Sequence, residues 1–206
     1  MGIKSLSKFI NDMSDKKGVI VRGELSLTDL IGKRIAIDGG TWLYSNTYQA
    51  ICQVIDKTNV LVEDIDRGEV LKILYRILLV FISTWAKCDI VPVFVFDGKA
   101  PKYKDDTKAK RLEKGEANRK LIKETKEKLK DKDLFDVDDD EISKLKSYLK
   151  QDIHLKKEEI EKFKSFLKAL GIPHLQAIGE AEPLCSMLNI EMKVAADMST
   201  DTDNIV

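Results

Sequence analysis

Two short, mostly apolar runs stand out in the pattern of hydrophobic and polar positions, and each run ends at an aspartate. The first run covers residues 34–37 and leads into Asp38, and the second covers residues 91–96 and leads into Asp97. Each aspartate is followed by glycine, which is typical of a turn. Short apolar runs that are bounded by turn signals predict buried strands, so the sequence predicts two strands that each end in a carboxylate.

Apolar positions that recur every three or four residues predict helices between and after these strands. This spacing is found over residues 42–48, 70–81 and 160–170. Residues 173–177 and 194–197 predict two further strands, each after a stretch with helical spacing. Because the predicted strands alternate with helices, we expect an α/β fold in which a mostly parallel sheet is flanked by helices.

Composition narrows the class of protein further. The 206 residues are 43% hydrophobic and 34% charged, which is enough apolar material for one sizeable core and excludes disordered, collagen-like and coiled-coil chains. The longest apolar stretch, residues 77–85, is well short of the roughly 20 residues that span a bilayer. The three cysteines, Cys52, Cys88 and Cys185, have no short spacing, so we expect neither disulfides nor a zinc cage and favour a reducing, intracellular compartment.

The balance of 35 basic and 35 acidic residues conceals an uneven distribution. Residues 98–130 contain 13 basic and six acidic residues, whereas residues 131–141 contain seven acidic residues and one lysine. The basic stretch has few large apolar residues, so it predicts a helical insertion that projects from the body. A charge run alone usually forms only a solvated helix with i,i+4 ion pairs, but this one directly follows Asp97.

Carboxylates follow each predicted strand at the point where the strand gives way to a loop. In an open α/β sheet the carboxyl ends of the strands meet at one crevice, so these side chains converge. Converging like charges repel unless cations neutralise them, and an oxygen-only ligand set favours Mg²⁺ or Mn²⁺ over zinc. Pairs of such ions support phosphodiester hydrolysis. The candidate metal ligands are Asp38, Asp97, Glu180, Glu182, Asp201 and Asp203.

Any one of these carboxylates, taken alone, is more often a helix cap than a metal ligand. Glu180 and Glu182 are more informative, because Pro183 is favoured at the first position of a helix and places both glutamates at a helix N-terminus. On the basic stretch, Lys104 and Arg111 are nearly two helical turns apart and share one face, so they can address one phosphate.

Several motifs, in this order along nearly the whole chain, resemble the flap endonuclease family of structure-specific 5′ nucleases, which are similar to the xeroderma pigmentosum group G nuclease. The resemblance implies a PIN-like nuclease core and hydrolysis of DNA at 5′ flaps or branches in replication or repair. It also implies two Mg²⁺ ions, for which Mn²⁺ can substitute, and identifies the basic insertion as a helical arch. The motifs are residues 1–6, 35–38, 93–99, 171–173, 179–182 and 200–203.

The resemblance also implies roles for single residues. The six carboxylates become metal ligands, among which Asp97 and Glu180 also count as catalytic, and Lys104 and Arg111 become phosphate-activating residues. Tyr44 resembles a base-stacking tyrosine, and stacking of one base is worth roughly 1–3 kcal/mol. The residues expected to contact DNA are Gly2, Tyr44, Lys99, Lys104, Lys108 and Arg111.

By this resemblance the chain divides into an N-terminal nuclease region at residues 1–101, an arch at 102–153 and an internal nuclease region at 154–206. Family members continue past the point that corresponds to Val206, so we expect reduced activity from this chain. Flap or branched DNA is the expected partner and no membrane is involved. A sliding clamp is possible in the family, although no clamp-binding segment is visible. The expected location is the nucleus or another site of DNA replication.

Two alternatives remain at this point. The first is a PIN-like metal-dependent ribonuclease, against which the long basic arch argues. The second is a truncated, non-catalytic DNA-binding remnant, which is favoured if truncation has removed the second metal ion. Incubation of a 5′-flap DNA with Mg²⁺ and with chelator separates these alternatives from a flap nuclease.

Overall fold

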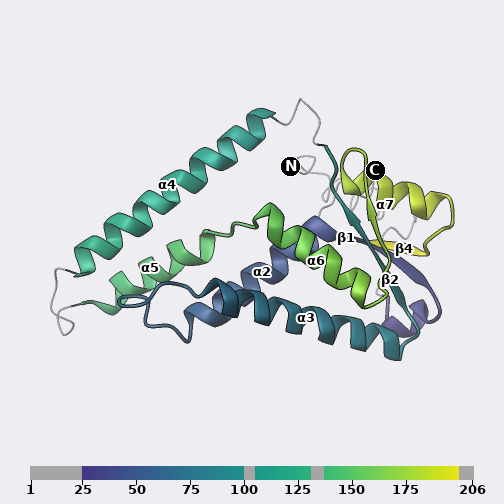
Figure 1. The fold of residues 1–206 in the computed structure, drawn as a ribbon, viewed down its shortest axis with the longest axis horizontal. Helices are drawn as coiled ribbons and strands as arrows, with labels where there is room; N and C mark the ends of the chain where they lie inside the picture. The colour runs from purple at the N-terminus through teal and green to yellow at the C-terminus, as the bar shows by residue number, and fades with distance from the viewer. Residues whose placement is uncertain (1–24, 100–104, 131–136, 200–206) are drawn as a thin grey trace, which may run out of the picture. The chain divides into compact units, whose positions relative to one another are not determined.

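The computed structural model of the chain describes residues 25–99, 105–130 and 137–199 (Figure 1). The chain forms two compact units, and each is assembled from segments that are distant in the sequence. The first comprises Met1–Trp42, Val80–Ala100 and Glu161–Val206, and the second comprises Leu43–Leu79 and Pro101–Ile160. The three regions predicted from the sequence, residues 1–101, 102–153 and 154–206, are instead continuous segments of the chain. That division stays a prediction.

A four-stranded sheet forms the centre of the first unit. Its strands are β1 (Arg34–Asp38), β2 (Val91–Phe96), β3 (His174–Gln176) and β4 (Ala196–Met198). The strand order is β3-β2-β1-β4, and every neighbouring pair is parallel. The predicted α/β class with a mostly parallel sheet is therefore confirmed. The last strand begins later than residue 194, because the backbone amide of Val194 instead donates a hydrogen bond to a carbonyl of the preceding helix.

Helices occur where the apolar spacing predicts them. The elements are the 3-10 helix η1 (Leu27–Leu30) and the helices α2 (Gly39–Ile55), α3 (Arg67–Lys87), α4 (Asp105–Lys130), α5 (Asp139–Gln151), α6 (Lys157–Ala169) and α7 (Ala181–Ile190). Within the described ranges, no helix has the length and apolar character needed to cross a membrane.

One face of the sheet packs against α7. Successive side chains of a strand point to opposite faces, so Val93 and Val95 of β2 share this face with Ala36 of β1. These residues form a buried cluster with Ala181 and Cys185 of α7. Small side chains dominate the cluster, which lets α7 lie close to the carboxyl ends of β1 and β2.

The opposite face of β2 carries an aromatic cluster. The ring of Phe94 lies 5.7 Å from Trp42 and 6.1 Å from Phe163 of α6, in edge-to-face arrangements. Phe81 of α3 packs on Trp42 at 5.7 Å, and Phe96 packs on Phe163 at 6.3 Å. Each such pair is worth about 0.5–1.5 kcal/mol beyond the burial of its area, so this cluster fixes α6 and the end of α3 to the sheet.

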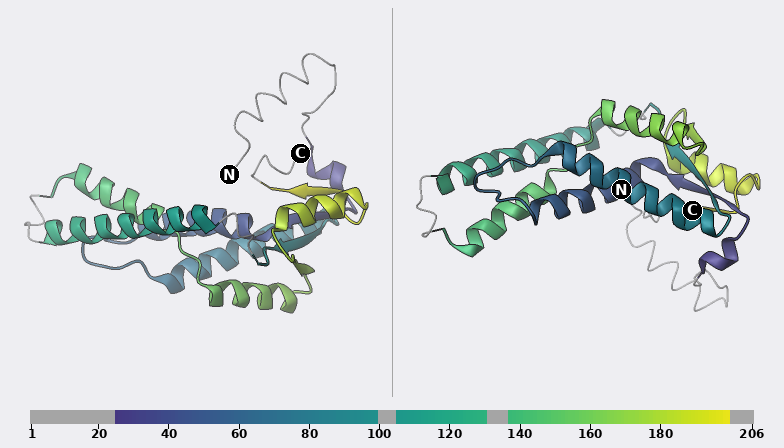
Figure 2. Two further views of the ribbon diagram at one scale, coloured as in Figure 1. Left: turned by 90° about the horizontal axis from the view of Figure 1, so that it is seen from above. Right: turned by 60° about the horizontal axis from the view of Figure 1, so that its bottom comes forward.

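In the second unit, α4 and α5 lie side by side, as both views of Figure 2 show. Leu129 of α4 and Leu145 of α5 are buried, and the side-chain amide of Asn118 donates a hydrogen bond of 2.9 Å to the carbonyl of Tyr148. The N-terminal half of α4 leaves Leu112 65% exposed. Residues 109–117 are almost all exposed, so this part of the predicted arch is a solvated helix, while its end is anchored on α5.

A nearly buried ion pair joins the start of α3 to the start of α6 within the second unit. The Arg67 guanidinium donates to both carboxylate oxygens of Glu159 at 2.7 Å and to the carbonyl of His154 at 2.6 Å. Glu159 is 9% exposed and also accepts from the backbone amide of Lys156. The hydrogen bond from Arg67 lowers the pKa of Glu159. A bidentate, charge-assisted pair of this kind contributes more than a surface ion pair.

We predict that Glu159→Gln lowers the free energy of unfolding at neutral pH by about 2 kcal/mol, because it leaves the Arg67 guanidinium without its charge partner. Since the pKa of Glu159 is lowered in the folded chain, the stabilisation is complete above the ordinary pKa of a glutamate and is lost as the pH falls through the lowered value. Urea unfolding at neutral and acidic pH measures both effects.

The matched control for this prediction is Glu69→Gln. Glu69 pairs with Lys72 at 2.5 Å in the same unit, but both side chains are exposed. The control is expected to cost less than about 0.5 kcal/mol at any pH. Equal losses in the two variants would show that the Arg67–Glu159 pair contributes no more than a surface pair.

Candidate metal centre

Asp97 is the first residue beyond β2, and its side chain holds the start of α7. Its Oδ1 atom accepts a hydrogen bond of 2.8 Å from the backbone amide of Ala181, the first residue of that helix. Glu180 is the N-cap residue of α7, and Glu182 lies in the first turn. The prediction that both glutamates lie at a helix N-terminus is confirmed. The prediction that Pro183 is the first helical residue is wrong, because α7 begins at Ala181 and Pro183 is its third residue. Proline is tolerated there because the first backbone amides of a helix have no intrahelical acceptor.

The backbone that follows β2 lies directly against the backbone that follows β3. The amide of Gly98 donates to the carbonyl of Gly179 at 2.6 Å, and the amide of Lys99 donates to the carbonyl of Ile178 at 3.1 Å. A Cβ atom on Gly98 would overlap the carbonyl oxygen of Ala177 and lie 2.6 Å from that of Ile178. Glycine at position 98 therefore permits the approach that brings Asp97 to the N-terminus of α7.

Asp38 ends the neighbouring strand β1 and is 7% exposed. Its two carboxylate oxygens accept hydrogen bonds of 2.9 Å from the backbone amide and the hydroxyl of Thr41. A Cβ atom built on Gly40 would lie 3.4 Å from Asp38 Oδ1 and 3.6 Å from Asp97 Oδ2. Both carboxylates therefore border the same small space at the N-terminus of α2, and the missing Cβ of Gly40 leaves that space open.

The buried thiol of Cys185 shows that further carboxylates lie around the same position. Burial raises the pKa of this thiol to about 12, and the negative charges of nearby carboxylates add to the effect. The contributing carboxylates are those of Asp38, Asp197, Glu182 and Asp97. Carboxylates from β1, β4, α7 and the end of β2 thus lie around the Cys185 thiol.

Asp197 is the member of this group that sequence reasoning missed. It lies in β4, in register with Ala36 of β1. A signal was present, because Asp197 is the last residue of the predicted strand 194–197 and the other candidates follow predicted strands in the same way. Asp201 and Asp203 were selected from that part of the chain, and they lie outside the described residues.

The donor chemistry of this edge fits a hard divalent cation. The converging groups are carboxylates, which Mg²⁺ and Mn²⁺ prefer, and Gly40 leaves space between two of them. Within the described ranges, however, no three Asp, Glu, His or Cys side chains lie close enough together to surround one ion. The geometry brings Asp38, Asp97 and Glu182 to one edge, and the ligand set as a whole stays a prediction.

The other predicted residues lie on different parts of the chain. Gly2 and Lys104 fall outside the described residues. Lys99 is exposed beside the loop that follows β3. Three of the predicted residues belong to the second unit. Tyr44 lies on α2 and is 56% exposed, and Arg111 lies on α4 and is exposed. The backbone of Lys108 is part of α4. Their roles toward DNA stay predictions.

A parallel sheet with carboxylates at its carboxyl edge and a basic helix after its second strand defines a PIN-like nuclease core. The XPG N-terminal domain model matches residues 1–118, which is more than half of the chain. The chain therefore belongs to the flap endonuclease and XPG family.

Individual relatives agree with this assignment. Flap endonuclease 1 of Sulfurisphaera tokodaii is 33% identical over 186 residues, covering 90% of this chain and 49% of the relative. The solved flap endonuclease 1 of Methanococcus jannaschii superimposes with a TM-score of 0.51 at 27% identity, covering 89% of this chain and 53% of that chain. The catalytic core of Rad2 in complex with DNA substrate superimposes with a TM-score of 0.56, covering 98% of this chain and 47% of that chain. Its sequence identity is 20%, so this match shows similarity of fold alone.

The chain spans only part of the length of these relatives. It covers 38–49% of the curated flap endonucleases that it matches. The family is therefore shown, whereas the activity and the substrate of this chain are matters for proposal.

We predict that Gly→Ala substitutions at Gly98 and at Gly115 change the free energy of unfolding in opposite directions. Gly98→Ala is expected to lower the free energy of unfolding by about 2 kcal/mol or more, because backbone carbonyls cannot move away from the added Cβ as a flexible side chain can. Gly115→Ala, in the interior of α4 with nothing within 4 Å of its Cβ position, is expected to stabilise by up to about 1 kcal/mol. Chemical denaturation of both variants tests this, and destabilisation by both would contradict it.

Proposed function

We propose that this chain carries the metal-dependent nuclease centre of a 5′ flap endonuclease and hydrolyses DNA phosphodiester bonds at flaps or branches. The observation that carries the proposal is the convergence of Asp38, Asp97 and Glu182 at the carboxyl edge of a parallel sheet. A divalent cation would offset the repulsion between carboxylates that lie near one another at this edge. Membership of the flap endonuclease and XPG family supports the same chemistry.

Two Mg²⁺ ions, or Mn²⁺ in their place, would supply an activated water and would stabilise the attacking and leaving oxygens of the phosphodiester. Asp38 and Asp97 are the described residues best placed to hold such ions, since their oxygens border one space at the N-terminus of α2. Glu180 and Glu182 would add ligands from the N-terminus of α7, and Asp201 and Asp203 would complete the set. The hydrogen bonds from Thr41 and Ala181 fix the two aspartates in place before an ion binds.

The basic helix α4 would recruit the DNA strand. Over its whole length the helix has ten lysines and arginines against six acidic residues, and exposed Arg111 lies in its first half. Phosphates attract such a surface whatever the base sequence, which suits an enzyme that selects its substrate by shape. The catalytic core of Rad2 and human GEN1, whose folds are similar to that of this chain, were solved in complex with a DNA substrate and with Holliday junction DNA, which supports DNA as the substrate here.

The same reasoning supports a set of narrower proposals. Tyr44, exposed on α2, would stack on an unpaired base, and Lys99, Lys104 and Lys108 would contact phosphates. A site of DNA replication, the nucleus included, is the proposed location, and a sliding clamp is a possible partner.

A second function, DNA binding without cleavage, is favoured by one observation: no three of the described acidic, His or Cys side chains can surround one ion.

Our first functional prediction concerns Asp97. The variant Asp97→Asn is expected to lose cleavage of a labelled 5′-flap DNA in Mg²⁺ by a factor of about 10³ or more, because it removes both a charge and a ligand from the centre. Its fold is expected to be intact, since the amide oxygen still accepts from Ala181. Single-turnover cleavage, with chelator as a blank, measures the loss.

Asp89→Asn is the matched control for this variant. Asp89 is exposed and has a φ of 53°, a conformation that asparagine adopts readily. The control is expected to cleave at the parent rate. If the parent chain binds flap DNA but does not cleave it in Mg²⁺, the second function replaces the first, and cleavage of RNA in place of DNA would indicate a ribonuclease.

The second functional prediction concerns α4. Arg111→Ala is expected to slow the bond-breaking step by about 10²-fold or more while DNA affinity changes little, because the other basic residues of the helix still attract the backbone. Lys120→Ala, which removes another exposed cation of α4, is the control and is expected to leave the single-turnover rate unchanged. Reduced affinity at an unchanged rate would make Arg111 an ordinary phosphate contact.

A further inference from the structure

The peptide group between Asp97 and Gly98 lies just beyond the last residue of β2, where the sheet no longer supplies hydrogen bonds. β2 ends at Phe96, whose partner in the sheet register is Gln176 at the end of β3. The carbonyl of Asp97 therefore has no strand opposite it to donate a hydrogen bond. The two peptide groups that flank Asp97 set its φ and ψ angles, so holding both of their carbonyl groups fixes the direction in which the Asp97 side chain leaves the backbone.

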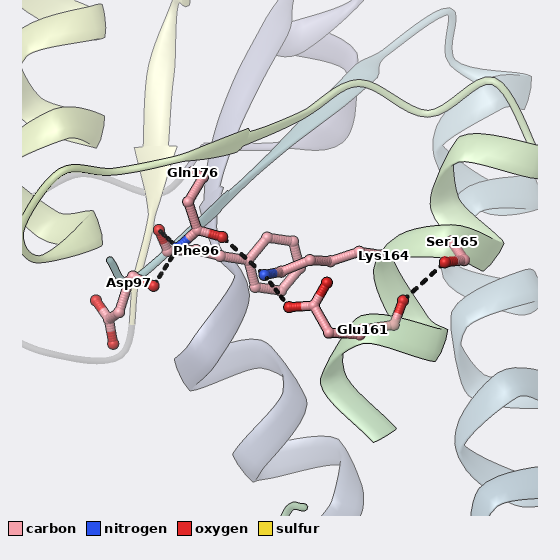
Figure 3. A network of polar contacts seen from close by, with 6 residues as sticks. All are labelled: Phe96, Asp97, Glu161, Lys164, Ser165 and Gln176. Carbon is pink, nitrogen blue, oxygen red and sulfur yellow. Dashed lines mark hydrogen bonds and ion pairs between the residues drawn. The ribbon is translucent and has the colours of Figure 1, made fainter. Parts of the chain in front are cut away.

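The side chain of Gln176 takes the place of the missing strand (Figure 3). Its Nε2 atom donates hydrogen bonds to the carbonyl oxygens of both Phe96 and Asp97. On the other side of the same peptide group, the amide of Gly98 donates to the carbonyl of Gly179 at 2.6 Å. The peptide is thus held through its carbonyl and its N–H at once, which fixes the direction in which Asp97 leaves the backbone.

Lys164 of α6 determines which way the Gln176 amide faces. Its Nζ atom donates to Gln176 Oε1 at 2.7 Å and to Glu161 Oε1 at 2.8 Å, and it lies 5.1 Å from the centre of the Phe96 ring (Figure 3). An ammonium group can only donate, so it requires the amide oxygen to point toward it. The amide nitrogen is then left facing the two carbonyls. The Lys164 side chain is only 15% exposed, whereas Gln176 and Asp97 are exposed.

We propose that Gln176 is a positioning residue for the Asp97 metal ligand, and that Lys164 acts through Gln176 by fixing the orientation of its amide. This inference rests on the proposed metal-dependent function. Neither side chain touches the metal ions or the substrate. Their contribution is to hold the carboxylate of Asp97 at the orientation in which it shares a space with Asp38.

The test measures metal binding directly, by the loss of the free Mn²⁺ signal in electron paramagnetic resonance during titration of the folded chain. Gln176→Leu keeps the volume of the side chain and removes both its donor and its acceptor. Lys164→Met keeps the aliphatic stem on Phe96 and removes the ammonium. Lys164→Arg retains a donor for the Gln176 oxygen and serves as the conservative variant. Melting temperatures in chelator establish that each variant is folded.

We expect Gln176→Leu to weaken Mn²⁺ binding by about tenfold, as is typical when a residue that orients a metal ligand is removed. Lys164→Met is expected to weaken binding by a smaller factor, and Lys164→Arg to restore most of the loss. The double variant Lys164→Met/Gln176→Leu is expected to bind no worse than Gln176→Leu alone, because the lysine acts through the glutamine. A purely structural role would lower the melting temperature without changing Mn²⁺ affinity in the folded state.

Glu161→Gln is the matched control, because it removes the negative charge of the other partner of Lys164 without touching the Gln176 amide or the two carbonyls. It is expected to bind Mn²⁺ as the parent does. Mn²⁺ binding that is lost in Asp97→Asn but unchanged in Gln176→Leu would overturn the positioning role and leave the proposed function standing. Failure of the parent chain to bind Mn²⁺ would overturn both.

Discussion

Gly98 lets the backbone that follows β2 lie directly against the carbonyls that follow β3, and the arrangement of the carboxylates depends on this contact. Two backbone hydrogen bonds, to Gly179 and Ile178, close the two segments onto each other. Asp97 is thereby placed at the N-terminus of α7, where it accepts from Ala181 and lies near the glutamates of the first turn. A side chain at position 98 would separate the two segments, so the position has room only for a hydrogen atom.

Two interpretations that compete at the level of sequence, helix cap and metal ligand, are compatible in the structure. Asp38 accepts from the backbone and hydroxyl of Thr41, and Asp97 accepts from the start of α7, as capping carboxylates do. Each carboxylate nevertheless keeps an oxygen beside the space at Gly40. The helix N-termini orient these side chains and offset part of their mutual repulsion. Capping therefore prepares the carboxylates for a cation and does not compete with it.

Much of the fold and part of the site could be predicted from the sequence. The runs that end at Asp38 and Asp97 gave both central strands, because buried parallel strands have a strong and short-range signal. Asp197 was missed because its proximity to Cys185 depends on how β4 pairs with β1, and pairing is a long-range property. The contacts of the Gln176 amide nitrogen could not be predicted for the same reason, since the carbonyls of Phe96 and Asp97 are about 80 positions away in the sequence.

The strand order also has a consequence for how the protein is made. β1 and β2 form the middle of the sheet and are complete once residue 96 has been synthesised, whereas the flanking strands β3 and β4 come only after α4, α5 and α6. The strands that cover the two outer edges of this pair are therefore synthesised last, so those edges can be paired only after residues 174–198 have been made. The carboxylates on α7 and β4 can join Asp38 and Asp97 only late in synthesis, so the negatively charged centre is one of the last parts of the fold to be assembled.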